Sequence, residues 1–213
     1  MISKNKTVKL NNNLGGKMNI TAKEIAAMRE KTGLPMMEIK SALIEADGDE
    51  EKALLILRKR GLSKSEKRAD KETKSGYVDS YVHAGRIGVL TEVLCETDFV
   101  AKNDDFKNFT HEISLQIAAT NPKYLNQESV PAEIIEKEKK LFIEEAKLAG
   151  KPDNIIDKIV EGKLNAYFSE ICLLDQPYFR DPEKIVSDLL NEIVAKTGEK
   201  IIISRFARIE LSC

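Results

Sequence analysis

The stretch ETDFVAKND, residues 96–104, contains the residues of this chain that most need a chemical explanation. An apolar run precedes it and a helical pattern begins at about Asp104, so Phe99 and Asp98 lie where a strand turns into a helix. Connections of this kind are normally polar. Taken alone, the residue types favour Phe99 as a core residue and Asp98 as the cap of the following helix.

Other constellations that carry chemistry are missing from the sequence. There is no glycine-rich phosphate loop, no dinucleotide fingerprint, and no serine or cysteine in a nucleophile motif. His83 and His111 have no histidine or cysteine neighbour at ligand spacing, so we expect neither a metal site nor a cofactor. The many carboxylates stand four residues from lysines on helical segments, which is typical of a solvated face. The chain is therefore not expected to be an enzyme.

Composition indicates a globular protein with a heavily charged surface. Of its 213 residues, 42% are hydrophobic and 32% are charged, and the net charge is -1. No apolar run approaches the ~18 residues that span a bilayer, so no membrane partner is expected. Cys95, Cys172 and Cys213 lack paired spacing, which favours reduced thiols in a cytosol-like compartment. Cys213 is free to pair with a second chain.

Two segments are predicted to lack a fold of their own. Residues 1–17 are rich in lysine and asparagine and read as a disordered leader. Residues 63–74 read as a charged linker that follows a helix end. Between Arg58 and Lys74 there are eight basic and three acidic residues, which leaves a nucleic-acid contact open as an alternative. The absence of interleaved aromatic residues argues against it.

Residues 18–62 are predicted to form a compact module of three short helices. Thr21 and Glu24 have the spacing of a capping box that starts the first helix. Gly33 and Pro35 separate the first helix from the second. A third helix follows a turn at residues 47–48, and we expect it to end at Gly61.

Residues 75–213 are predicted to form an α+β core with strands and helices in two layers. GYVDSYVH and RIGVLTEVLC form a hairpin around residues 83–85, and IIISRFARIEL adds a third strand. We expect a core of about three antiparallel strands with helices on one face. The apolar stripe of the first core helix comprises Phe106, Phe109, Ile113 and Ile117. One face of the last strand comprises Ile201, Ile203, Ala207, Ile209 and Leu211.

A protruding antiparallel helical hairpin is predicted to be inserted into this core at about residues 122–180. Two amphipathic segments with apolar pairs such as Leu141/Phe142 and Leu148/Ala149 are joined by Gly150-Lys151-Pro152, and such a short link predicts an antiparallel hairpin. Most of their apolar seam would be buried between them. A closing helix, PEKIVSDLLNEIVAKTG, follows.

Three segments together resemble the elongation factor Ts family of bacteria and organelles: NITAKEIAAMREKTGLPMMEIKSAL, DGDEEKALLILRKRG and RIGVLTEVLCETDFVAKND. The resemblance covers nearly the whole chain from Met18 onward. It implies a ubiquitin-associated-like three-helix module and a function as nucleotide exchange factor for elongation factor Tu. Such a factor binds the GDP form, displaces Mg²⁺ and lets GTP rebind, without covalent chemistry.

The same resemblance implies roles for particular residues. Asp98 and Phe99 would insert as a wedge beside the partner's Mg²⁺ site, and Thr97 and Val100 would shape the turn that presents them. Val100 is also a candidate core residue. In the N-terminal module, Arg29, Met36 and Met37 are expected to contact the partner. The alternatives place one methionine in the module core and leave Arg29 solvated.

The chain carries one copy of the core subdomain where longer relatives carry two, and it therefore resembles the short members of the family. These are expected to dimerise and form a two-plus-two complex with elongation factor Tu. The expected location is the cytoplasm, or the stroma of a plastid. Two other functions stay open: a module that recruits proteins without nucleotide exchange, and an RNA-binding protein that uses residues 58–74, which predicts steeply salt-dependent affinity.

Overall fold

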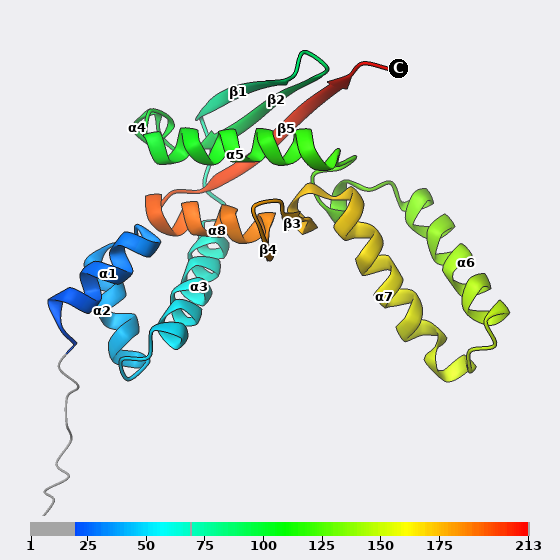
Figure 1. Ribbon diagram of the computed structural model, residues 1–213, viewed down its shortest axis with the longest axis horizontal. Helices are drawn as coiled ribbons and strands as arrows, with labels where there is room; N and C mark the ends of the chain where they lie inside the picture. Colours follow the sequence, from blue (N-terminus) through cyan, green and yellow to red (C-terminus); the bar gives the residue numbers. More distant parts are fainter. Residues whose placement is uncertain (1–19, 69, 213) are drawn as a thin grey trace, which may run out of the picture. The chain divides into compact units, whose positions relative to one another are not determined.

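The computed structural model describes residues 20–68 and 70–212, apart from the side chains of Leu62 and residues 64–67 (Figure 1). The expected leader, residues 1–17, and Cys213 therefore lie outside the described residues. The chain divides into two compact units, Met1–Leu57 and Arg58–Cys213. The predicted boundaries at residues 62 and 74 stay predictions.

The first unit contains helices α1 (Ala22–Thr32) and α2 (Met36–Glu45) and the first part of α3 (Glu50–Lys67). The predicted capping box is confirmed, because the Glu24 backbone N–H donates to Thr21 Oγ1 and Glu24 in turn accepts from the Thr21 backbone. Gly33 ends α1 in the left-handed region, at φ 67°. The buried apolar side chains of the first unit are Ile25, Met28, Leu34, Ile39, Ala42, Leu43, Ala46, Ala53 and Leu57.

The predicted end of the third helix at Gly61 is wrong, because α3 continues to Lys67. Glycine costs about 1 kcal/mol in a helix interior, but this cost is offset where a neighbour approaches closely. A Cβ atom at Gly61 would lie 3.4 Å from Ala195 Cβ and from the Asn191 carbonyl oxygen of α8 (Val186–Thr197). The glycine therefore allows close packing of two helices instead of ending one.

The sheet of the second unit has three antiparallel strands, as predicted, and their order is β1-β2-β5. These are β1 (Ser75–His83), β2 (Ile87–Cys95) and β5 (Ile201–Glu210). Ala84 and Gly85 both have positive φ, and the Arg86 N–H donates to the His83 carbonyl, which is the tight turn that suits a twisted hairpin.

The predicted apolar face of β5 is only half right. Ile201 and Ile203 are buried, but the register with β2 shifts between Glu92 and Val93, so Ser204 is an extra residue. A β-bulge of this kind reverses the side-chain alternation beyond it. Ile209 therefore lies on the outer face and is 74% exposed.

Helices cover one face of the sheet, which confirms the predicted α+β class (Figure 1). Helix α4 (Asp98–Ala101) follows β2 directly, and α5 (Asp104–Thr120) lies against β1 and β2. The predicted stripe of α5 is buried throughout: Phe106, Phe109, Ile113 and Ile117. These side chains form one core cluster with Val89 and Val93 of β2 and with Val194 of α8.

The predicted helical hairpin is present as α6 (Ala132–Leu148) and α7 (Asp153–Ile171). A short 3₁₀ turn, η1 (Gln127–Ser129), precedes it. Ala146, Ile156 and Val160 are buried between the helices. The predicted apolar contact between the two helices does not extend to the tip of the hairpin, because Leu148 is exposed. Leu141, which lies earlier on α6, is exposed as well.

The chain returns from the hairpin through η2 (Leu173–Asp175) and a two-stranded ribbon, β3 (Pro177–Tyr178) and β4 (Asp181–Ile185). The closing helix was expected to begin near Pro182 but begins at Val186. The N-cap residue there is Ile185, and its N–H donates to the carboxylate of Asp188, the N3 residue, as in a capping box. Buried Gln116 ties the ribbon to α5 by donating to the Pro177 carbonyl and accepting from the Phe179 N–H.

Candidate functional site

The turn that carries Asp98 and Phe99 is a single helical turn between β2 and α5. Thr97 is its N-cap, with Oγ1 accepting from the Val100 N–H at 3.4 Å. The Thr97 carbonyl accepts from the Ala101 N–H. Val100 is 6% exposed and packs in the core cluster, so it anchors the turn from beneath.

Phe99 projects out of this turn and is 81% exposed. The interpretation that places it in the core, which the residue types alone favour, is therefore wrong. An isolated large aromatic side chain in water gives up the burial that normally stabilises it. The reason is positional: in α4 the side chain of Val100 faces the sheet, and the preceding residue points away from it.

Asp98 lies beside Phe99 in the first turn of α4 and is not the cap that its residue type suggested. Thr97 caps α4 and Asn103 caps α5. Asp98 instead accepts from Lys102 Nζ at 2.8 Å, and this hydrogen bond and the lysine charge lower the pKa of Asp98. Both side chains are largely exposed, so the pair contributes little to stability.

A pair of carboxylates that the sequence did not identify holds the base of this turn. The Thr97 N–H donates to Glu199 Oε2 at 3.1 Å, and Thr97 Oγ1 donates to Glu199 Oε1 at 2.6 Å. Glu96 Oε1 accepts from the Lys200 N–H and from the Arg68 guanidinium, each at 2.6 Å. Burial opposes the charge of Glu96, but these hydrogen bonds prevail and its pKa is lowered.

The three remaining predicted site residues belong to the first unit. Met36 and Met37 lie in the first turn of α2 and are 45% and 75% exposed. The alternative that one of them fills the module core is wrong, because both are exposed, whereas Met28 of α1 is buried. Arg29 is also exposed on α1.

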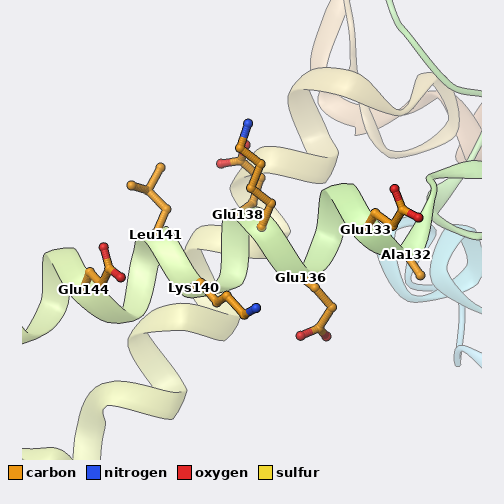
Figure 2. Close-up of a pocket in the computed structure, with 8 residues that line it drawn as sticks. Ala132, Glu133, Glu136, Glu138, Lys140, Leu141 and Glu144 are labelled. Atoms are coloured by element: carbon orange, nitrogen blue, oxygen red, sulfur yellow. The ribbon is translucent and has the colours of Figure 1, made fainter.

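An open groove of about 680 Å³ runs along α6 (Figure 2). All of its lining residues come from that one helix, and Leu141 and Glu136 project from opposite sides of it. An active site needs several polar groups that converge on one point. The charged side chains that line this groove are spread along one helix and do not form such a point.

Both described cysteines, Cys95 and Cys172, are buried. Burial raises the pKa of the Cys95 thiol to about 11, with a further contribution from the Glu199 charge. Burial likewise raises the pKa of Cys172 to about 11. Within residues 20–68 and 70–212, no three histidine, cysteine or acidic side chains gather as a metal site, and no helix is both long and apolar enough to cross a membrane.

Comparison with known proteins gives one consistent result. A sequence profile of the family described as Elongation factor TS matches residues 109–210. The elongation factor Ts of Caldanaerobacter subterraneus subsp. tengcongensis is 55% identical over 192 residues, covering 90% of this chain and 96% of the relative. Those of Thermodesulfovibrio yellowstonii and Moorella thermoacetica are 49% and 48% identical, over 97% and 95% of their lengths and 91% and 90% of this chain.

Proposed function

Because the chain belongs to the elongation factor Ts family, we propose that it is a guanine nucleotide exchange factor for elongation factor Tu. It binds the GDP form of that GTPase, displaces Mg²⁺ and promotes GDP release, so that GTP can rebind. One observation carries this proposal: Phe99, 81% exposed, stands on a turn that is anchored at its base. No covalent chemistry is required of the chain, which would act in the cytoplasm.

Phe99 supplies the mechanical part of the exchange. Mg²⁺ demands near-octahedral oxygen geometry at short distances, so a small displacement of its surroundings weakens its binding. Phe99 fills a gap in the partner with rigid aromatic volume, and its burial there provides about 2–3 kcal/mol to offset the distortion. The diphosphate then loses its counter-ion, and GDP dissociates.

Asp98 supplies the electrostatic part. The carboxylate is negatively charged at neutral pH with or without Lys102, because the ordinary pKa of an aspartate already lies far below neutral and Lys102 lowers it further. Its exposed partner Lys102 is released at small cost, because surface ion pairs contribute little. The free carboxylate then competes for hydrogen-bond donors that hold the partner's nucleotide site closed. Factor and GDP weaken each other's binding by the same amount, as thermodynamic linkage requires.

The first unit adds contacts to the same partner in this proposal. We assign it as a ubiquitin-associated-like module whose exposed Met36 and Met37 meet an apolar surface. Flexible thioether side chains adapt to such surfaces without strain. Arg29, exposed on α1, contributes a polar contact.

A second part of the proposal concerns the sheet face that α4 and α5 leave uncovered. The exposed apolar side chains of this face come from all three strands: Val78, Val82, Leu90 and Ile209. Apolar clusters on a protein surface favour association, and two identical faces satisfy each other about a two-fold axis. We propose that two copies pair through this face, so that the complex holds two factors and two partners.

Leu90→Lys should convert the dimer to a monomer. Leu90 lies on the central strand and is exposed in the single chain, so lysine there leaves the fold intact but buries a charge in the dimer. Light scattering should give the 23.9 kDa chain mass for this variant and twice that mass for the wild type. Reductant prevents a Cys213 disulfide from mimicking the dimer.

Leu148→Lys, an exposed leucine at the tip of the helical hairpin, is the matched control and should remain dimeric. A wild-type chain that is monomeric at every concentration tested rules out the dimer. If the Leu90→Lys chain stays dimeric, the interface lies on a surface other than this sheet face.

Release of fluorescent GDP from elongation factor Tu tests the exchange function. We expect the wild-type chain to accelerate release by ~10³, which corresponds to about 4 kcal/mol off the barrier. Excess unlabelled GDP prevents the fluorescent GDP from rebinding. The release rate is measured at increasing factor concentrations until it no longer rises. If saturating factor leaves the rate unchanged, the exchange function is wrong and protein recruitment without exchange becomes the better account.

A further inference from the structure

The turn that presents Phe99 has little internal support. Helix α4 has four residues, and the pair of Asp98 with the C-cap residue Lys102 is exposed to water. A helix this short is not stable by itself, because nucleation costs more than one turn of hydrogen bonds returns. Its geometry must therefore come from groups outside the turn.

The ladder between β2 and β5 ends just before the turn, at the pair Cys95–Ile201. Beyond that pair, the two backbones no longer exchange hydrogen bonds with each other, and side-chain carboxylates take their place. Glu96 accepts the Lys200 N–H, and Glu199 accepts the Thr97 N–H. Each strand thus satisfies a backbone donor of the other, which extends the pairing by two residues.

Glu199 does more than continue the ladder, because it also accepts from the Thr97 hydroxyl at 2.6 Å. The same Oγ1 caps α4 by accepting from the Val100 N–H. With its proton committed to Glu199, the hydroxyl presents a lone pair toward the helix. A single carboxylate thereby sets both the backbone position and the side-chain rotamer of the cap.

The approach of Glu199 depends on the end of α8. Gly198 stands in the left-handed region at φ 72°, and its N–H donates to the Val194 carbonyl. This helix end turns the chain toward the base of the α4 turn. The contact therefore joins two segments that lie 102 residues apart in the sequence.

We propose that Glu199 is a positioning residue for nucleotide exchange, which holds Thr97 so that Asp98 and Phe99 stand in the orientation the partner requires. The inference rests on the proposed exchange function. In this role Glu199 acts through Thr97 and not by contact with the nucleotide or Mg²⁺. Its loss lets the turn sample other orientations, so the ring is correctly inserted in a smaller fraction of the bound complexes.

Glu199→Ala should lower the maximal rate of GDP release at saturating factor about tenfold, which corresponds to ~1.4 kcal/mol in the barrier. The factor concentration that gives half the maximal rate should change less than about twofold, because Phe99 and the other contacts remain. Glu199→Gln should recover most of the rate. Its amide oxygen still accepts the Thr97 N–H, and its amide nitrogen can donate to the Thr97 hydroxyl.

Glu192→Ala is the matched control, since Glu192 on α8 makes an exposed ion pair with Lys184 and should leave exchange unchanged. Hydrogen exchange of the chain alone gives a second readout that needs no partner. Amides of residues 96–102 should exchange faster in Glu199→Ala than in Glu192→Ala, while those of α5 keep their protection.

The possible failures are distinguishable. If the wild-type chain does not accelerate GDP release, the exchange function fails, but hydrogen exchange still reports whether Glu199 orders the turn. If exchange proceeds in the wild type and Glu199→Ala matches it, the positioning role is wrong. Unchanged protection of residues 96–102, or an equal loss in Glu199→Ala and Glu199→Gln, also contradicts it.

Discussion

Phe99→Ala should reduce the acceleration of GDP release by about 30- to 150-fold while leaving the folded chain unchanged. The loss corresponds to the ~2–3 kcal/mol that burial of a phenylalanine ring provides at an interface. Stability should stay within about 0.5 kcal/mol of the wild type, because the ring is 81% exposed in the chain itself. An effect on exchange without an effect on folding identifies a residue that works on the partner.

The effect on exchange is measured as the maximal rate of fluorescent GDP release at saturating factor. Thermal unfolding of the same samples measures the effect on stability. Phe179→Ala is the control, since Phe179 is also an exposed phenylalanine of the second unit but lies in the β3–β4 segment. It should keep the wild-type rate. Acceleration that survives Phe99→Ala would keep the family assignment and move the mechanism to another surface.

Phe106→Ala should affect stability and not exchange, the opposite of Phe99→Ala. We expect a loss of about 3–5 kcal/mol in the free energy of unfolding. Phe106 lies seven residues after Phe99 and is 0% exposed. It packs in the cluster that joins α5 to β2, and alanine there loses both the transfer free energy and the contacts around the resulting cavity.

Urea unfolding at one fixed protein concentration measures this loss, because a dimer makes the midpoint depend on concentration. Where the alanine variant does not fold, Phe106→Leu supplies a smaller change in the same direction. Any Phe106 variant that remains folded should keep most of the maximal exchange rate. A stability loss below about 1 kcal/mol for Phe106→Ala would contradict the close packing of Phe106 in the core cluster.

Much of the fold follows from short stretches of sequence. The apolar stripe of α5, the capping box of α1 and the separation of α1 from α2 at Gly33 and Pro35 are all local signals, and each is present. The hairpin of β1 and β2 likewise follows from two β-rich runs around a turn. These features need only neighbouring residues, so local pattern suffices to predict them.

Three of the wrong expectations share one cause, which is a tertiary contact that overrides a local preference. Gly61 has the residue type of a helix end, but α8 packs against it. Residues 182–185 have a helical composition, but they lie in β4, which pairs with β3 through Asp181 and Ile185. Beyond Ser204 the alternation of β5 predicts the wrong face, because a bulge shifts its register with β2.

By itself, the sequence determined the class of fold, the family and the position of the ETDFVAKND turn, because these depend on residue types and spacings along the chain. The residue types alone favoured Phe99 as a core residue, and only the tertiary structure showed that it is exposed, because Val100 packs in the core in its place. The tertiary structure alone brought Glu199 to Thr97, because no local pattern reports a hydrogen bond between residues 102 positions apart.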